Sequence, residues 1–351
     1  MIPRLEIYFD RAERRLFYYG TKSDTTPKGR NGEYLLNHCR SGLQLALESL
    51  RLKPQTGVGM MVYNCHTVMN SISEAGYKPV FVDVTNGLTI DMEDLARKRS
   101  QIKVLIVTHL FGIVNDIKAI KALYPDLIII EDCAHFFNHA IEGDMGVYSV
   151  GQGKFPSIGD GGILVVNPKS QISNLQSKID SLYETLPRYS RVGEMKLFMR
   201  LWGKAWMYKP WIYEHVTIRL KGKRDVGNEN VREHVVLRKM SHGIVNILMQ
   251  KRAHYTKDVA ERMKNANEIL NHKSSIINGQ CIIGSNAFML VVRTEDVAEL
   301  KVKFATRGVE TETHFTHCID WAKQFGYQCG DCPNAEKLIT RLLMIPTYFK
   351  I

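Results

Sequence analysis

Residues 127–162 read LIIIEDCAHFFNHAIEGDMGVYSVGQGKFPSIGDGG, and this stretch decides the fold. An apolar strand ends in the acidic pair Glu131-Asp132, and two more apolar strands, 146–150 and 162–167, bracket a glycine-rich loop that carries Lys154. Strands that are apolar at nearly every position are typical of a sheet buried on both faces. The stretch therefore predicts a mainly parallel sheet, whose ligands bind at the carboxyl ends of its strands.

The same pattern extends toward the N-terminus. Apolar strands are predicted at 58–65, 78–84 and 103–110, with helices between them and one earlier helix that starts near Ser41-Gly42. This alternation predicts a three-layer α/β/α fold, in which helices cover both faces of the sheet.

The pattern changes after Pro168. The segment of about 170–225 is predicted to be a helical insert rich in basic and aromatic residues, and 243–270 suits one long helix that connects two domains. The remainder reads as a small α+β domain, with strands predicted at 287–294 and 309–315 and helices at 295–306 and 334–343. We therefore expect a large domain over residues 1–242, and a connector helix with a small C-terminal domain over 243–351.

Composition limits the function classes. No apolar run is long enough to span a bilayer, and the N-terminus lacks the apolar core of a signal peptide, so a cytoplasmic location is expected. The formal net charge of +11 indicates anionic partners: phosphorylated substrates, nucleic acid or a membrane surface. Most of this excess lies between Arg188 and Arg224, with 10 Lys/Arg against 2 acids. No known nucleic-acid-binding module is present, which disfavours nucleic acid.

The cysteines do not predict a disulfide framework or a metal centre. Their number, 7, is odd and they are scattered, which favours reduced thiols. Cys329 and Cys332 form one CxxC downstream of His317-Cys318, a set that could bind zinc. A surface loop with incidental cysteines is the favoured interpretation, because there is no second CxxC and the spacing fits no zinc finger.

Asp132 and Lys154 carry the predicted chemistry. The strand places Asp132 at its carboxyl end, and period-two alternation turns Glu131 to the opposite side. An acid that keeps a pyridine nitrogen protonated and a lysine that binds the cofactor covalently are what a pyridoxal 5′-phosphate enzyme requires. The alternative interpretation makes Glu131-Asp132 a strand cap and Lys154 a solvated loop residue.

Other motifs could hold the rest of such a cofactor. Arg40-Ser41-Gly42 stands at the predicted start of a helix, where free N–H groups bind anions. An ordinary serine N-cap would have the same sequence pattern. Ser149 precedes the lysine loop and could reach a phosphate. His135 and His66 could each contact a ring, or could be ordinary loop histidines.

Taken together, these motifs resemble the DegT/StrS-type sugar aminotransferases, which are pyridoxal phosphate enzymes of fold type I. The resemblance is close over about 35–167 and loose in the C-terminal part. It rests on the following segments: SGLQLAL (41–47), AGYKPVFVDV (75–84), IVTHLFG (106–112), IIEDCAH (129–135), YSVGQGKFPSIGDGG (148–162) and MIPTY (344–348).

The resemblance implies a role for each matched residue. Asp132 would pair with the pyridine nitrogen, and Lys154 would bind the cofactor and then move the substrate proton. Ser41, the Gly42 amide and Ser149 would hold the phosphate, and His135 would stand near the ring hydroxyl. His314 and Phe315 match a stretch near the sugar site. Family members are homodimers whose active sites are shared between subunits.

The sequence departs from the family pattern at several points. Leu43 replaces a threonine, GDGG replaces GEGG, and the segment for an aromatic residue that stacks on the cofactor is shortened to YNCHT, where His66 is the candidate. The insert at 185–225 has no clear counterpart. These differences bear on the sugar more than on the cofactor.

The predicted reaction is transfer of an amino group from an amino acid, glutamate being favoured, to a nucleotide-linked keto-sugar in glycan or polysaccharide biosynthesis. A dehydratase or other lyase acting on a sugar is the alternative, but that branch of the family has histidine in place of the lysine. A third hypothesis is contact of residues 185–225 with a membrane surface, because Trp202, Trp206 and Trp211 stand among basic residues. Burial of this segment at a dimer or domain interface is the favoured interpretation of the pattern.

Overall fold

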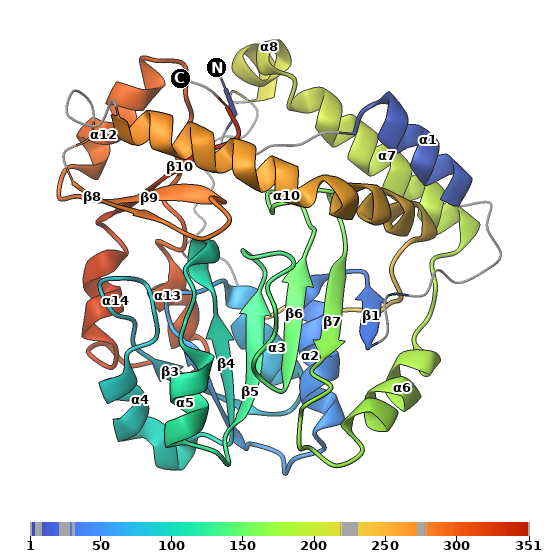
Figure 1. Cartoon of the computed structure of the whole chain (residues 1–351), viewed down its shortest axis with the longest axis vertical. Helices are drawn as coiled ribbons and strands as arrows, with labels where there is room; N and C mark the ends of the chain where they lie inside the picture. Colours follow the sequence, from blue (N-terminus) through green and yellow to red (C-terminus); the bar gives the residue numbers. More distant parts are fainter. Residues whose placement is uncertain are drawn as a thin grey trace.

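A seven-stranded sheet forms the centre of the protein in the computed structural model (Figure 1). Its strand order is β1-β7-β6-β5-β4-β2-β3, with β7 antiparallel to both neighbours and the strands from β6 to β3 parallel. The strands are β1 (Glu33–Leu36), β2 (Gly57–Met61), β3 (Lys78–Val82), β4 (Val104–Thr108), β5 (Ile128–Cys133), β6 (Met145–Ser149) and β7 (Gly162–Val166). The structure describes residues 2–3, 9–20, 29, 32–217, 219, 231–271, 277 and 279–349.

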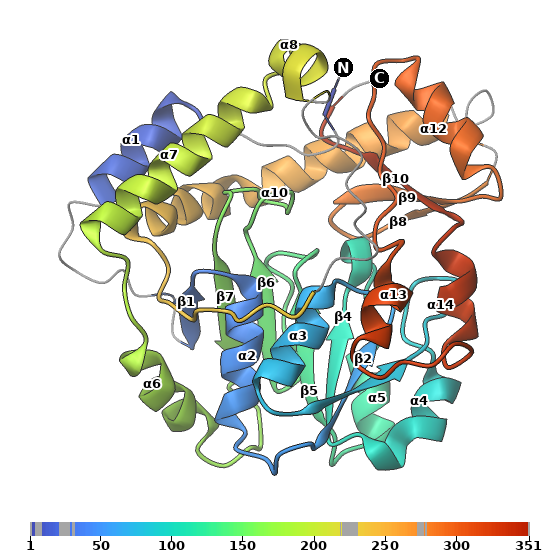
Figure 2. The same cartoon turned by 180° about the vertical axis from the view of Figure 1, so that it is seen from behind.

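Helices cover both faces of this sheet, as predicted for a three-layer α/β/α fold. One face carries α2 (Cys39–Ser49) and α3 (His66–Glu74), and the other carries α4 (Met92–Lys98) and α5 (Ile117–Leu123) (Figures 1 and 2). The strands have no solvent-facing side, and every residue of β4 and β6 is buried. This two-sided burial explains why their sequences are apolar without alternation. Two short 3₁₀ segments, η1 (Arg99–Gln101) and η2 (Leu110–Gly112), flank β4.

A second, antiparallel sheet of three strands lies in the C-terminal part of the chain. Its order is β10-β9-β8, from Leu342–Pro346, Met289–Arg293 and Gln280–Ile283. Its helices are α12 (Val297–Ala305), α13 (Cys318–Lys323) and α14 (Pro333–Leu338). The 30-residue helix α10 (His242–Asn271) runs across the end of the large sheet and reaches this small one (Figure 1). The predicted division between residues 242 and 243 stays a prediction, because one hydrophobic core includes residues from both sides of it.

The predicted insert is mainly helical in its described part, with non-helical residues at 170–174 and 186–190. It contains α6 (Leu175–Thr185), α7 (Arg191–Met207), α8 (Pro210–Ile212) and the π-helical turn η3 (Tyr213–Thr217). Helix α1 (Arg11–Gly20) lies beside α7 in both views, and the Phe198 ring packs on Phe9 and Phe17 (Figures 1 and 2). The last predicted residues of the insert, 220–225, lie outside the described residues.

Some element boundaries differ from the sequence-based expectation. Helix α2 begins at Cys39 rather than near Ser41-Gly42, because His38 takes the extended N-cap conformation. The segment 309–315, expected to be a strand, makes only isolated bridges at Val309 and Glu312. The helix expected over 334–343 ends at Leu338, since the residues from Leu342 onward are apolar and pair with β9.

Candidate active site

A cavity of about 230 Å³ lies at the carboxyl ends of β2, β4, β5 and β6. The chain passes from β2 outward to β3 and then returns to β4 on the other side of β2, so the cavity lies where the direction of winding reverses. Open α/β sheets bind ligands at such switch points. The lining includes Arg40, Asn64, Thr108, Asp132, His135, Ser149, Lys154 and Phe315.

Asp132 is held in a fixed orientation on the cavity wall. Its carboxylate accepts hydrogen bonds from the Ala134 N–H at 3.0 Å and from the Thr108 hydroxyl at 3.1 Å. The Thr108 hydroxyl in turn accepts a bond from Asn64 Nδ2 at 2.7 Å. Burial raises the pKa of Asp132 above its ordinary value, although these bonds and the charge of Lys154 act in the opposite direction. A cation in the cavity would offset the cost of burying this carboxylate.

Lys154 enters the same cavity from the loop between β6 and β7. Its side chain is half-buried, and it forms no ion pair within the described part of the chain. Gly159 and Gly161 have φ values of +98° and +115°, which side chains rarely adopt, so this loop needs glycine there. Ser149, the last residue of β6, lines the cavity and accepts a 3.4 Å bond from the Gly151 N–H.

His135 belongs to a buried aromatic cluster at the cavity wall. Its Nδ1 accepts a hydrogen bond from the Phe111 N–H at 3.2 Å, and its ring stacks on Phe111 and lies parallel to Phe315. Burial, together with the charge of Lys154, lowers the pKa of His135 well below its usual value. The ring is therefore neutral with its proton on Nε2, which makes it a hydrogen-bond donor.

The start of helix α2 supplies the polar end of the cavity. The first hydrogen bond of the helix runs from the Gly42 N–H to the His38 carbonyl at 3.3 Å, so earlier N–H groups have no acceptor within the helix. Cys39 and Arg40 line the cavity. Ser41 is fully buried beside them, and its hydroxyl has no hydrogen-bond partner among the described residues. An oxyanion fits this arrangement, because it can accept hydrogen bonds from the free backbone N–H groups and from the Ser41 hydroxyl.

Four predicted site residues lie outside the cavity lining: Ser41 and Gly42, described above, and the two histidines His66 and His314. His66, the first residue of α3, packs its ring edge-on against Trp321 with the centroids 5.0 Å apart. His314 packs edge-on against Phe315, and its Nδ1 lies 3.2 Å from the Glu312 carboxylate. Of the residues predicted from sequence, the structure thus brings Asp132, His135, Ser149, Lys154 and Phe315 together in one lining.

Several lining residues were not singled out from the sequence. Asn64 and Thr108 follow or end apolar strands, so the rule that placed Asp132 could have found them. Phe111, which contacts the lining residue His135 but is not itself in the lining, carries no such signal: its φ of +54° and this contact depend on the folded chain.

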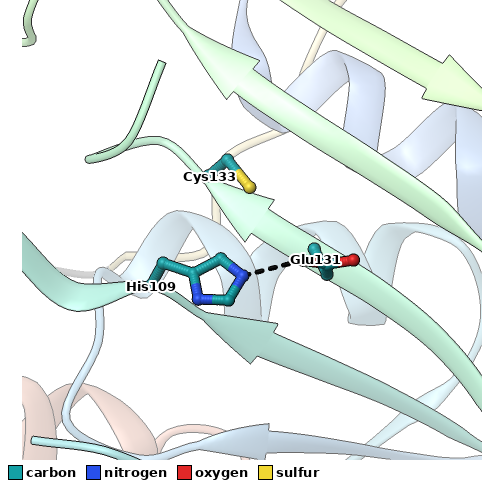
Figure 3. A group of neighbouring side chains, drawn as sticks. All are labelled: His109, Glu131 and Cys133. Atoms are coloured by element: carbon teal, nitrogen blue, oxygen red, sulfur yellow. Dashed lines mark hydrogen bonds and ion pairs between the residues drawn. The ribbon is translucent and has the colours of Figure 1, made fainter. Parts of the chain in front are cut away.

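Glu131 points away from the cavity, as the alternation predicted, into a buried cluster with His109 and Cys133 (Figure 3). His109 Nε2 lies 2.8 Å from the Glu131 carboxylate, and His139 Nε2 lies 3.4 Å from it. The other carboxylate oxygen accepts the Gly143 N–H at 2.5 Å. Burial alone would raise the pKa of Glu131, but these bonds outweigh it and hold the pKa at about 2. The carboxylate of Glu131 is thus fully hydrogen-bonded, and the cluster is structural rather than an open set of metal ligands.

The loop of Lys154 is braced by helix α7. Arg200 donates to the buried Asp160 carboxylate at 2.9 Å, and His38 Nδ1 lies 2.9 Å from its other oxygen. Lys204 donates to Gln152 Oε1 at 2.6 Å. The insert therefore fixes both sides of the lysine loop and links it to the start of α2.

The four candidate zinc ligands do not form one group in the described structure. Cys318 and Cys332 are buried, whereas Cys329 is exposed. Burial raises the pKa of the Cys318 thiol to about 12. His317 Nδ1 faces Asp320 at 3.9 Å.

The sheet order, the buried carboxylate and the loop lysine define a class: a pyridoxal phosphate enzyme of fold type I. Comparison with known proteins identifies the family. The sequence profile of the DegT/DnrJ/EryC1/StrS aminotransferase family matches residues 35–203 and 229–351. The chain belongs to this family and is a pyridoxal phosphate-dependent aminotransferase.

Individual relatives agree with this assignment. The spore coat polysaccharide biosynthesis protein SpsC of Bacillus subtilis is 25% identical over 340 residues, 89% of this chain and 79% of that protein. The GDP-perosamine synthase of Escherichia coli O157:H7 is 29% identical over 139 residues, 36% of this chain and 38% of that enzyme. Spr1654 of Streptococcus pneumoniae, solved in a PLP form, superposes with a TM-score of 0.72 at 15% identity, covering 100% of this chain and 94% of that one.

Proposed function

We propose that this enzyme transfers an amino group from an amino acid, glutamate, to a nucleotide-linked keto-sugar in glycan or polysaccharide biosynthesis. The observation that carries the proposal is the meeting of Asp132 and Lys154 at one cavity with Arg40 on its wall. The basic wall suits a phosphorylated substrate. The names of two relatives, a GDP-perosamine synthase and a polysaccharide biosynthesis protein, support the substrate class.

In this proposal Asp132 would hold the ring nitrogen of the cofactor at the cavity wall. The carboxylate accepts the ring N–H, and the resulting ion pair offsets the cost of burying Asp132. The free N–H groups of the first turn of α2, the Ser41 hydroxyl and Ser149 would hold the phosphate. The Gly42 amide, also predicted for this role, donates to the His38 carbonyl at 3.3 Å. The Nε2–H of His135 donates to the ring oxygen. Stacking by His66 stays a prediction, because His66 packs on Trp321.

When bound, pyridoxal phosphate supplies a cationic conjugated ring that withdraws electrons from the substrate carbon. Lys154 holds the cofactor and, once released, its Nζ takes the proton from the substrate Cα and returns it to the adjacent position. Asp132 keeps the ring nitrogen charged throughout. The cluster of His135 and Phe111 excludes water from this side of the cavity.

We further propose that the enzyme is a cytoplasmic homodimer with shared active sites.

Phe315 lines the cavity, and His314 packs edge-on against it at 5.1 Å between centroids. Both residues would face the sugar. A dehydratase reaction on the same substrate is the alternative, and the lysine at position 154 favours amination.

Absorption spectroscopy tests this proposal. Purified protein incubated with pyridoxal phosphate is expected to show a visible band that borohydride bleaches, and Lys154→Ala is expected to lack it. L-Glutamate should discharge the band, and a nucleotide-linked keto-sugar should restore it.

Lys169→Ala is the matched control, because Lys169 is exposed and lies outside the cavity. The control should keep the band. A wild-type protein that stays colourless with added cofactor would overturn the site, whereas a coloured protein that glutamate leaves unchanged would overturn only the donor. Release of water without amination would establish the dehydratase.

A further inference from the structure

The outward side of helix α7 carries an exposed apolar stripe. Val192, Met195, Met199, Trp202 and Trp206 follow one another at alternating spacings of three and four residues, which places them on one side of the helix. Their exposed fractions range from 43% to 65%. Large apolar side chains gathered in this way mark a surface that binds something.

This stripe is distinct from the side of α7 that packs on the protein. Leu197 and Leu201 are buried, and Leu201 reaches the Lys154 loop at Gly159. The Phe198 ring packs on Phe9 and Phe17. Packing within the chain thus explains one apolar side of α7 but not the other.

The surroundings of the stripe are strongly basic. Among the described residues between 188 and 219, the exposed cations are Arg188, Arg191, Lys196, Arg200, Lys204, Lys209 and Arg219. The acids in this range are Glu214, which is exposed, and Glu194, which is buried against the Ser241 hydroxyl. The occupant of this surface therefore has to be both apolar and negatively charged.

A hollow beside the two tryptophans extends the surface toward α1. Its volume is about 230 Å³, and its lining includes Trp202, Trp206 and Phe9 together with Arg14, Lys209 and Asp10. Trp211, 68% exposed, follows on the same segment. Tryptophan is favoured at the boundary between lipid headgroups and acyl chains, because its ring is apolar and its N–H is polar.

We propose that the stripe on α7, with Trp211 and the flanking cations, is a peripheral docking surface for an anionic lipid bilayer. The apolar side chains would insert at the level of the headgroups, and the cations would contact anionic lipids. No helix within the described residues has the length and apolar content needed to cross a bilayer, so the contact is interfacial. A second copy of α7 fits less well, because two such basic surfaces repel each other.

This docking would bring the bilayer close to the active site. The same helix that carries the stripe donates from Arg200 to Asp160 and from Lys204 to Gln152 in the lysine loop. The inference nevertheless rests on the surface alone and holds whatever the substrate is.

Vesicle cosedimentation tests the surface with the full chain loaded with pyridoxal phosphate. Vesicles of phosphatidylcholine mixed with phosphatidylglycerol should pellet the protein at low salt, and vesicles of phosphatidylcholine alone should pellet much less. High salt should weaken the binding, because it screens the charges. Brominated lipids should quench the tryptophan fluorescence.

Two sets of variants separate the apolar and the charged contributions. The double variant Trp202→Ser with Trp206→Ser, and the triple variant Arg191→Gln, Lys196→Gln and Lys209→Gln, should each lower the vesicle partition coefficient at least about tenfold. The matched controls alter equally exposed residues elsewhere: Leu123→Ser with Val302→Ser, and Lys257→Gln with Lys301→Gln. Both controls should bind like the wild type.

Several results would overturn the proposal. Absence of binding to the mixed vesicles at low salt would do so, as would equal loss of binding in the control variants. Conversion of a dimer to a monomer by the tryptophan changes, seen in light scattering, would instead identify the stripe as an interface between copies. The charge variants keep the test valid if the tryptophan variant fails to fold.

Discussion

Asp132 is expected to contribute to function at the expense of stability. Its carboxylate is buried at the cavity, and burial raises its pKa despite the opposing charge of Lys154, so the charged form is disfavoured. Asp132→Asn should therefore leave the thermal midpoint of the cofactor-free protein unchanged or higher. Turnover should fall by about 30-fold or more, because breaking a buried charge pair costs ~2–5 kcal/mol.

Asp83 provides the matched control for this variant. It is equally buried, but its carboxylate accepts hydrogen bonds from the backbone N–H groups of Val84, Asn334 and Ala335. Asp83→Asn should lower stability by ~1–3 kcal/mol and keep the visible cofactor band. Calorimetry and steady-state kinetics would measure both effects, and a parallel loss of stability and turnover in the two variants would contradict the assigned role of Asp132.

Glu131 is expected to make stability depend on acid pH. Its folded pKa of about 2 lies below the ordinary value of 4.5, so its contribution is complete above pH 4.5 and is lost as pH falls toward 2. Glu131→Gln should lower the free energy of unfolding at neutral pH by about 3 kcal/mol. Urea titrations at about pH 7 and about pH 3 should show this difference shrinking in acid.

Glu142→Gln is the control for that measurement, because Glu142 pairs with the exposed Lys118 at the surface. It should change stability by less than about 1 kcal/mol at either pH. A Glu131 variant as stable as the Glu142 variant would show that the buried hydrogen bonds of Glu131 contribute nothing.

For single residues, the sequence could predict a place in the site where the neighbours along the chain define the position. Asp132 follows an apolar strand and Lys154 lies between two, so both could be assigned before the structure was known. The partner of Asp160 could not be predicted, because Arg200 comes from a helix that reaches it only in the folded chain. His66 was chosen by its place after a strand, whereas its ring packs outside the cavity lining.

Among the elements, α7 is expected to determine how firmly the lysine loop is held. Arg200→Met removes the 2.9 Å bond to Asp160 and leaves that buried carboxylate with one cationic partner fewer. We expect a stability loss of ~1–3 kcal/mol and faster loss of the visible cofactor band during dialysis. Lys196→Met, on the outward side of the same helix, is the control. Equal rates of band loss in the two variants would show that the brace has no such role.

The elements of the large sheet could be predicted because each strand is an uninterrupted apolar run. β1 and β8 were not predicted, since each has only four residues and pairs at a sheet edge. Residues 309–315 alternate in the sequence like a strand, yet only isolated bridges form there. Whether these residues pair as a strand depends on segments distant in the sequence, and the local sequence pattern does not predict such pairing.

For the whole molecule, the continuous core predicts cooperative unfolding. One apolar cluster includes Leu105 of the large sheet together with Val291 and Met344 of the small one. Differential scanning calorimetry should therefore show a single transition whose calorimetric and van't Hoff enthalpies agree. Dependence of its midpoint on protein concentration would support the homodimer. Two separated transitions would instead mean that the two sheets unfold independently.

The first turn of α2 has a consequence for isotope exchange. Its hydrogen-bond ladder begins at Gly42, so the N–H groups of Arg40 and Ser41 have no acceptor within the helix. In deuterated water these two amides should exchange quickly although Ser41 is buried, while the amides after them are protected. A phosphate bound by this turn would slow both. The exchange rate of two backbone hydrogens thus reports occupancy of the site even when no reaction takes place.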